Sequence, residues 1–125
     1  MPASRFRRAV EARDLDAMVA ALAEDVVFRS PVVFRAYEGR AAVGAILAAV
    51  LETFEDFRYT DALDGKDLHA LLFSARVGDR DVDGIDLLRF DDDGLLRELT
   101  VMVRPLSGLT ALADAMRVRL EAAGA

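Results

Sequence analysis

The chain has 125 residues, of which 54% are hydrophobic and 30% are charged, so we expect one compact domain over residues 1–125. It has no cysteine, which excludes disulfides and thiolate metal sites. No apolar run approaches the roughly 18 residues of a membrane-spanning helix. We therefore expect no membrane as a partner, and because the formal net charge of −6 repels a phosphate backbone, we expect no nucleic acid either.

The first half of the chain predicts three helices and one strand. Residues 4–23 show helical spacing in two pieces that join at "ARDLD", where Asp14 can cap the second helix. The β-branched segment "EDVVFRSP" stops at Pro31 and indicates a short strand. Apolar residues from Val43 to Phe54 recur every three or four positions, which predicts a third helix. Charged residues interrupt the N-terminus before an apolar segment forms, so we expect no secretion signal and a cytoplasmic location.

The second half predicts most of a sheet. Four segments are typical of strands, namely "FRYTDAL", "LHALLFSARV", "RDVDGIDLLRF" and "LLRELTVMVR", and turn sequences separate them. Pro105 ends the last strand, and a closing helix that Ser107 can cap follows. Helices followed by an antiparallel meander predict an α+β fold in which helices cover one face of a curved sheet. Neither the glycines nor "DDDG" at residues 91–94 match a nucleotide or calcium loop, so we expect no cofactor and no metal.

The strand predicted at residues 68–77 is apolar on both faces. One face carries His69, Leu71, Phe73 and Ala75, and the other carries Leu68, Ala70 and Leu72. An antiparallel sheet with one solvated face should instead alternate apolar with polar residues. Both faces therefore need a cover, and a second copy of the chain is the simplest one. We predict a homodimer that forms through the sheet.

The segment "GIDLLRF" places a carboxylate, Asp86, in an otherwise apolar strand. Alternation puts Asp86 on the same face as Leu88 and Phe90. A buried Asp is rare unless it is paired or functional, because removing a charge from water costs free energy. Asp86 is therefore either the partner of an arginine or a site residue whose apolar setting raises its pKa. The candidate arginines are Arg76, Arg97 and Arg104.

His69 is the predicted partner of Asp86 in catalysis. A hairpin turn at Gly78 and Asp79 pairs Leu71 with Asp86 and puts His69 diagonally from Asp86 on the same face. One acid and one base at that separation can exchange protons near neutral pH. Asp86 and His69 are thus the candidate catalytic residues. The alternative is that a lone His in an apolar strand is a core or interface residue, and a register slip of one position would move it to the opposite face.

The run "ARDLDAMVAALAEDVVFRSPVVFRAYEGRAAVGAIL", followed later by "GIDLLRFDDDGLLRELTVMVRP", resembles the nuclear transport factor 2-like superfamily, especially its SnoaL-like branch. The resemblance covers nearly the whole chain. It implies one SnoaL-like domain with a cystatin-like fold, in which N-terminal helices pack over the concave face of a cone-shaped antiparallel sheet and a C-terminal helix follows. It also implies a central apolar pocket and dimers through the sheet. Members include ketosteroid isomerases, polyketide cyclases, limonene epoxide hydrolase, dehydratases and noncatalytic modules.

The isomerase site transfers to this chain only in part. The resemblance places the oxyanion-hole Asp of the isomerase on Asp86, its general-base Asp on Ser30 and its catalytic Tyr on Phe6. Serine cannot by itself take a proton from carbon, and Phe6 offers no hydroxyl to a developing oxyanion. The resemblance therefore argues against standard ketosteroid isomerase activity.

Strand parity and the resemblance together predict the wall of a lipophilic pocket. The predicted lining residues are Phe6, Val10, Phe28, Ser30, Ile46, Leu47, Phe54, Leu88, Leu99, Val101 and Val103. Such a wall suits a steroid, a polyketide or a terpene-like molecule. The predicted function is to bind that molecule, with cofactor-independent isomerase, cyclase, dehydratase or hydrolase chemistry at Asp86. The alternative is a noncatalytic ligand-binding or dimerisation module whose interior is filled.

Overall fold

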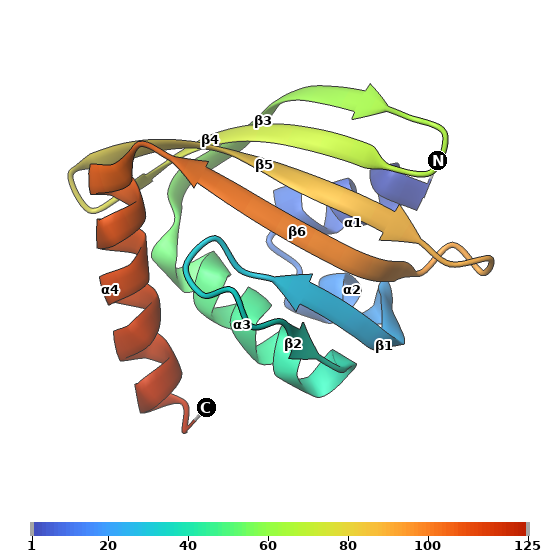
Figure 1. Cartoon of the computed structure of the whole chain (residues 1–125), viewed down its shortest axis with the longest axis horizontal. Helices are drawn as coiled ribbons and strands as arrows, with labels where there is room; N and C mark the ends of the chain where they lie inside the picture. The colour runs from blue at the N-terminus through green and yellow to red at the C-terminus, as the bar shows by residue number, and fades with distance from the viewer. Residues whose placement is uncertain (1, 125) are drawn as a thin grey trace.

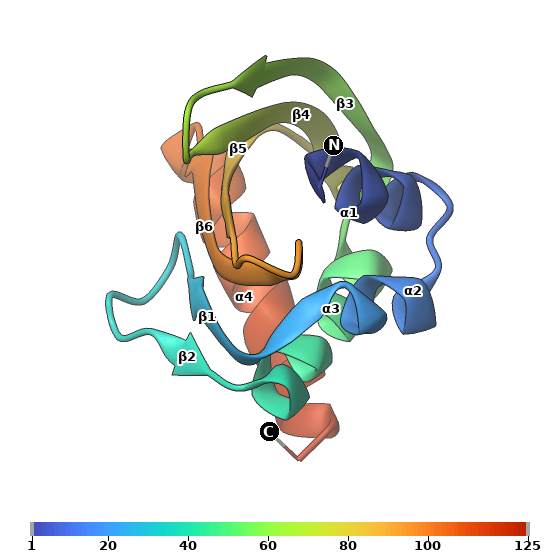
Figure 2. The same cartoon turned by 90° about the vertical axis from the view of Figure 1, so that its right-hand side faces the viewer.

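A curved six-stranded sheet curls around the N-terminal helices in the computed structural model, which describes residues 2–124 (Figures 1 and 2). The elements are α1 (Pro2–Glu11), α2 (Leu15–Ala20), β1 (Leu22–Arg29), β2 (Tyr37–Glu38), α3 (Arg40–Thr53), β3 (Glu55–Asp64), β4 (His69–Val77), β5 (Arg80–Phe90), β6 (Leu96–Arg104) and α4 (Leu106–Ala122). Within residues 2–124 the strand order is β2-β1-β6-β5-β4-β3, and only the β1–β6 pair is parallel. The predicted α+β fold with a closing helix is confirmed.

The N-terminal boundaries differ from the predicted ones at the end of α2. Asp14 caps α2 as expected, because its carboxylate accepts a hydrogen bond from the Ala17 amide at 3.1 Å. Leu22, however, starts β1 instead of continuing the helix, and it lies opposite Leu96 in β6. The Leu96 amide donates to the Ala21 carbonyl at 2.8 Å, so pairing with the sheet overrides the helical spacing.

Two smaller differences concern a cap and a strand. The predicted cap at Ser107 is wrong, because α4 already starts at Leu106 after Pro105 and the Leu109 amide donates to the Pro105 carbonyl at 2.9 Å. The two-residue strand β2 was not predicted. It is held by an antiparallel pairing in which Tyr37 lies opposite Phe28.

The β4–β5 hairpin has the predicted register. It turns at Gly78, whose φ of 61° lies in the left-handed region that favours glycine. Leu71 therefore lies opposite Asp86, and His69 lies opposite Leu88. This register turns Asp86 towards the concave side of the sheet, which the helices cover.

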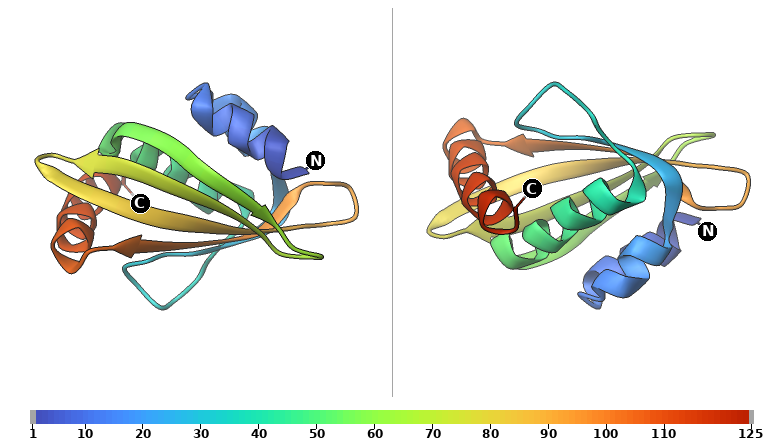
Figure 3. Two further views of the ribbon diagram at one scale, coloured as in Figure 1. Left: turned by 90° about the horizontal axis from the view of Figure 1, so that it is seen from above. Right: turned by 90° about the horizontal axis from the view of Figure 1, so that it is seen from below.

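No helix of residues 2–124 covers the opposite, convex face of the sheet in the view from above (Figure 3). The strand pairing places an apolar band on this face. We define the convex band as Leu63, Ala70, Leu72, Ile85, Leu87 and Met102, which neighbour one another across β3, β4, β5 and β6. Leu63 is 59% exposed and Met102 is 54% exposed. The expectation that β4 is apolar on both faces is thus confirmed. No helix within residues 2–124 is long and apolar enough to cross a membrane.

Candidate functional site

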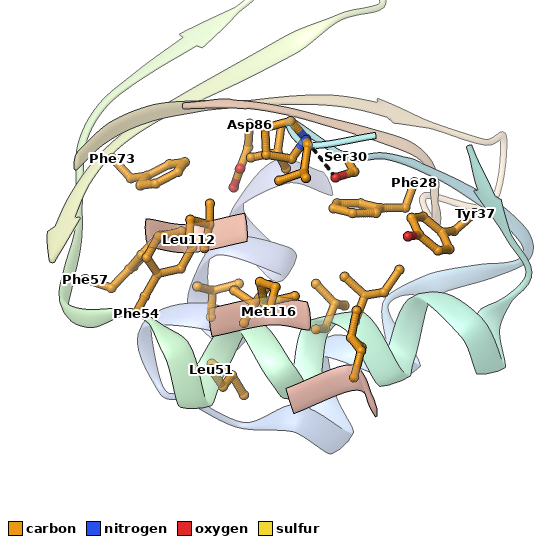
Figure 4. Close-up of a pocket in the computed structure, with 18 of the residues that line it drawn as sticks. Phe28, Ser30, Tyr37, Leu51, Phe54, Phe57, Phe73, Asp86, Leu112 and Met116 are labelled. Carbon is orange, nitrogen blue, oxygen red and sulfur yellow. Dashed lines mark hydrogen bonds between the residues drawn. The ribbon is translucent and has the colours of Figure 1, made fainter. Parts of the chain in front are cut away.

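An apolar cavity of about 540 Å³ lies between the concave face of the sheet and the helices (Figure 4). Eight of the predicted lining residues line it, namely Phe6, Val10, Phe28, Ser30, Ile46, Leu47, Phe54 and Val101. Helix α4 closes part of the cavity with Leu112 and Met116. The side-chain hydroxyl of Thr53 in α3 donates to the Ala49 carbonyl at 2.7 Å and lies 3.6 Å from the Met116 sulfur, so the two helices are in contact beside the cavity.

Three predicted lining residues do not reach the cavity. Leu88 and Leu99 form a cross-strand pair that is 0% and 2% exposed, so other core side chains cover both. Val103 lies opposite Gly84, where the ring of Phe73 fills the space that a side chain at Gly84 would need. Phe73 forms the cavity wall there in place of Val103. Strand parity gave the correct face for these residues but could not show which of them are covered.

Asp86 lies in the wall of this cavity and hydrogen bonds to a tyrosine. The hydroxyl of Tyr59 donates to Oδ2 of Asp86 at 3.2 Å, and the two residues are 9% and 7% exposed. Burial raises the pKa of Asp86 from 3.8 to about 7, although the hydrogen bond from Tyr59 lowers it in part. Burial and the neighbouring carboxylate also raise the pKa of Tyr59 well above its ordinary value. The direction of this shift is the one that the apolar setting of Asp86 predicts from the sequence.

The second carboxylate oxygen of Asp86, Oδ1, has no hydrogen-bond partner in residues 2–124. Every fully buried side-chain nitrogen or oxygen in this part of the chain does have a partner. Oδ1 must therefore be accessible from the cavity, which Asp86 lines. In the close-up, the carboxylate points away from the sheet and into the space between the walls (Figure 4). Asp86 thus presents one anchored oxygen and one free oxygen.

The ion-pair interpretation of Asp86 is wrong, because the three candidate arginines have other partners on the surface. Arg76 binds Glu55 at 2.7 Å and Asp56 at 2.9 Å, Arg97 binds Asp67 at 3.6 Å, and Arg104 binds Asp83 at 3.1 Å. The residue that contacts the Asp86 carboxylate is an uncharged phenol. Asp86 is therefore not held as half of a structural salt bridge.

His69 hydrogen bonds to Asp64 and not to Asp86. Its Nδ1 lies 2.8 Å from the Asp64 carboxylate, and its ring meets Phe90 edge-on with 5.8 Å between centroids. Asp64 lies directly opposite His69 in the β3–β4 pair, so it is a nearer partner than the diagonal Asp86. His69 does not line the cavity. The structure therefore does not form the predicted pair of Asp86 and His69, although the register that suggested it is correct.

The sequence does not reveal which face of β3 carries the side chain of Tyr59. A bulge in β3 places Tyr59 opposite Phe73 and Asp61 opposite Leu72, so one extra residue, Thr60, interrupts the alternation. Without the bulge, Thr60 would face the interior and Tyr59 would face outwards. The guanidinium of Arg7 in α1 lies 5.5 Å from the centre of the Tyr59 ring and covers it from the helix side.

The raised pKa of Asp86 predicts a pH-dependent stability. Between about pH 4 and pH 7, the folded protein keeps a proton on Asp86 that the unfolded chain has released. The contribution of Asp86 to the free energy of unfolding therefore falls as the pH rises through this window, by roughly 4 kcal/mol in total. Asp86→Asn removes this term. Urea unfolding from pH 4 to pH 8 should show the variant gaining stability relative to the wild type as the pH rises.

The variant Tyr59→Phe is the second arm of this experiment. It removes the hydrogen bond that lowers the pKa of Asp86, so the fall in stability should extend to higher pH than in the wild type. Parallel stability curves for the wild type and Asp86→Asn across the whole pH range would show that Asp86 has an ordinary pKa.

Comparisons with known proteins agree with this fold. Residues 3–99 match the family model of the SnoaL-like domain. The chain is similar to a steroid delta-isomerase from Pseudomonas aeruginosa, with 43% identity, a TM-score of 0.92, and coverage of 97% of this chain and 90% of that one. It is also similar to a protein with a cystatin-like fold from Silicibacter pomeroyi, with 34% identity, a TM-score of 0.91, and coverage of 96% and 85%.

A more distant structure shows the fold alone. A protein described as a SnoaL-like polyketide cyclase from Shewanella denitrificans is 16% identical, with a TM-score of 0.68 and coverage of 94% of this chain and 95% of that one. No functionally curated protein matches the sequence. Because the family model covers most of the chain and the isomerase from P. aeruginosa is similar over nearly all of it, the chain belongs to the SnoaL-like family of the nuclear transport factor 2-like fold.

Proposed function

We propose that this protein binds a small lipophilic molecule that carries an oxygen atom, and that Asp86 hydrogen bonds to this oxygen. The observation that carries the proposal is the free Oδ1 of a carboxyl group whose other oxygen is held by Tyr59 at 3.2 Å. The cavity of about 540 Å³ has a size typical of small-molecule sites. Its aromatic and aliphatic walls favour an apolar ligand, since burying apolar area supplies affinity and a few polar contacts set the orientation.

Asp86 can act both as a hydrogen-bond donor and as an acceptor near neutral pH. With a pKa of about 7 it exists in both protonation states there. When Asp86 is protonated, Oδ1 can donate to a ligand carbonyl while Oδ2 continues to accept from Tyr59. A neutral carboxyl group in an apolar setting serves the same purpose in ketosteroid isomerase. The hydrogen bond from Asp86 becomes stronger when negative charge develops on the ligand oxygen, and this favours acid-catalysed chemistry.

The relative from P. aeruginosa supports a steroid-sized ligand, because its name describes a steroid delta-isomerase and it is 43% identical to this chain. The isomerase base is nevertheless missing here. Ser30 lines the cavity at that position, and its side-chain oxygen accepts a hydrogen bond from the Val32 amide at 3.0 Å. Phe6 lines the cavity without a hydroxyl. The proposed chemistry is therefore proton donation to an oxygen by Asp86, not proton shuttling between carbon atoms by a second carboxylate.

Ligand binding without turnover is the second candidate function. It is supported by the surroundings of Asp86, since the one side chain that hydrogen bonds to it in residues 2–124 is Tyr59. No second acid or base is placed within hydrogen-bond distance in this part of the chain. A site of this kind can bind and orient a carbonyl compound without completing a reaction.

A binding titration against pH tests the proposed function. The probe is a keto steroid, and the readout is its dissociation constant from pH 5 to pH 9 by calorimetry. If protonated Asp86 donates to the ketone, wild-type affinity should be constant below about pH 7 and should fall about tenfold for each further pH unit. Asp86→Asn keeps an N–H donor and should bind independently of pH. Asp86→Leu has no donor and should bind at least tenfold more weakly at low pH.

Two outcomes decide between the candidates. Wild-type affinity that is independent of pH and equal to that of Asp86→Leu would contradict any role for Asp86 in binding.

Absorbance during incubation with an unconjugated keto steroid then separates binding from isomerisation. We expect no conversion faster than about one turnover per second, because the base is absent. Faster conversion would show that another group has replaced the missing base.

We also propose that the chain forms a homodimer through the convex band of the sheet. The band is apolar, and polar side chains border it on one side, where Arg104 forms an ion pair with Asp83 at 3.1 Å and the Ser74 hydroxyl donates to Asp83 at 2.7 Å. An apolar centre with a polar rim is the usual composition of a protein interface. A second copy would remove Leu63 and Met102 from water without any change in the fold.

Light scattering measures the oligomeric state directly. The wild type should have a mass of about 27 kDa at micromolar concentration, twice the 13.6 kDa of one chain. Met102→Glu places a charge in the convex band and should give the monomer mass. Val118→Glu is the matched control, because Val118 is 57% exposed on α4 and lies outside the band. A monomeric wild type, or equal masses for both variants, would contradict the proposed interface.

A further inference from the structure

The cavity has a second polar wall, away from Asp86, at the β1–β2 pair. Tyr37 lines the cavity, and its hydroxyl has no hydrogen-bond partner among the residues that the structure describes. In the close-up its oxygen points into the cavity, and its ring lies beside Phe28 on the opposite side of the view from Phe73 (Figure 4). The carboxylate of Asp86 enters the same cavity from β5. Two polar groups from different strands therefore face one apolar space.

The position of Tyr37 is fixed by the backbone. Tyr37 lies opposite Phe28 in the short β1–β2 pair, and the two ring centroids are 6.3 Å apart. Immediately after β2, the Gly39 amide donates to the Val26 carbonyl at 2.8 Å, and the chain then enters α3. The tyrosine ring is thus attached to a paired segment, not to a free loop. A hydroxyl held in this way can favour a ligand whose oxygen lies at the matching position, in addition to favouring a polar ligand over an apolar one.

Ser30 adds a second hydroxyl to the wall that carries Phe28. Its side-chain oxygen accepts from the Val32 amide at 3.0 Å and from the Val33 amide at 3.5 Å, so its own proton remains free to donate. No acceptor for that proton lies within hydrogen-bond distance in residues 2–124. Phe28 and Ser30 are two positions apart in the chain, and both line the cavity.

We propose that Tyr37 is a specificity-determining residue that hydrogen bonds to a second oxygen of the ligand. The ligand class is then a rigid lipophilic molecule with one oxygen function towards Asp86 and another, a hydroxyl or ketone, towards Tyr37. This inference rests on the proposed function, because it assumes that the first oxygen binds at Asp86. It adds the requirement that the ligand be oxygenated at both ends. A ligand with a single oxygen leaves the Tyr37 hydroxyl in the apolar cavity without a partner, which weakens selection for that ligand.

Matched ligand pairs test this inference. Each pair has the same rigid skeleton with an oxygen at one end or at both ends, and the skeletons increase in length: naphthol and naphthalenediol, hydroxybiphenyl and biphenyldiol, and a keto steroid without or with a hydroxyl at its far end. Calorimetry gives the dissociation constants for the wild type and Tyr37→Phe. For the skeleton that spans the two groups, the second oxygen should raise wild-type affinity about threefold to tenfold. Tyr37→Phe should lose this gain while its affinity for the one-oxygen ligand stays the same.

Two further variants make the result specific. Ser74→Ala removes a hydroxyl from the outer face of β4 and should leave every constant unchanged. Asp86→Leu should weaken both members of each pair equally. The inference is overturned if no pair shows a gain in the wild type, or if the gain survives in Tyr37→Phe. If no ligand binds the wild type, or if Asp86→Leu binds as the wild type does, the proposed function fails instead, and with it the premise of the inference.

Discussion

The hydrogen bond from Tyr59 to the buried carboxyl group of Asp86 is the interaction on which the candidate site depends. An ionised carboxylate would be costly in this apolar wall, and no arginine neutralises it in residues 2–124. The phenol satisfies one oxygen without adding charge, and burial keeps the pKa near 7. The result is an acid that is present in both its protonated and its ionised form near neutral pH and that faces an open cavity. A cationic partner would instead have held Asp86 ionised and unable to donate.

The fold maintains this state by keeping charged side chains away from the Asp86 carboxyl group. The charged residues Glu11, Arg13, Asp114, Arg117 and Glu121 line other parts of the cavity. Arg76 in β4, Arg89 in β5 and Arg104 in β6 point to the outer face, where Asp and Glu bind them. The inner faces of the same strands carry Phe73, Asp86 and Val101, and helix α4 closes the space with Leu112 and Met116. Helix α4 lies beyond residues 3–99, which match the family model.

Sequence patterns predicted the fold and the location of the site, but not its hydrogen bonds. Strand alternation and the Gly78 turn gave the register that places Asp86 on the concave face, because both depend on local chemistry. The direction of the Tyr59 side chain could not be predicted, because it depends on a bulge whose extra residue has no recognisable sequence signature. The predicted pair of His69 and Asp86 does not form, for a similar reason. The neighbour of His69, Asp64, comes from a third strand, and the pairing of that strand shifts at the same bulge.

The most direct test is a pH titration of Asp86 itself. It is monitored by carbon-13 NMR of the side-chain carboxyl groups in protein labelled at aspartate, and the Asp86 resonance is assigned by its absence in Asp86→Asn. We expect a midpoint near pH 7 that moves to higher pH when a keto steroid is bound, because the ketone accepts a hydrogen bond only from the protonated form. A midpoint near the ordinary value of 3.8 that is unchanged by the ligand would contradict this expectation.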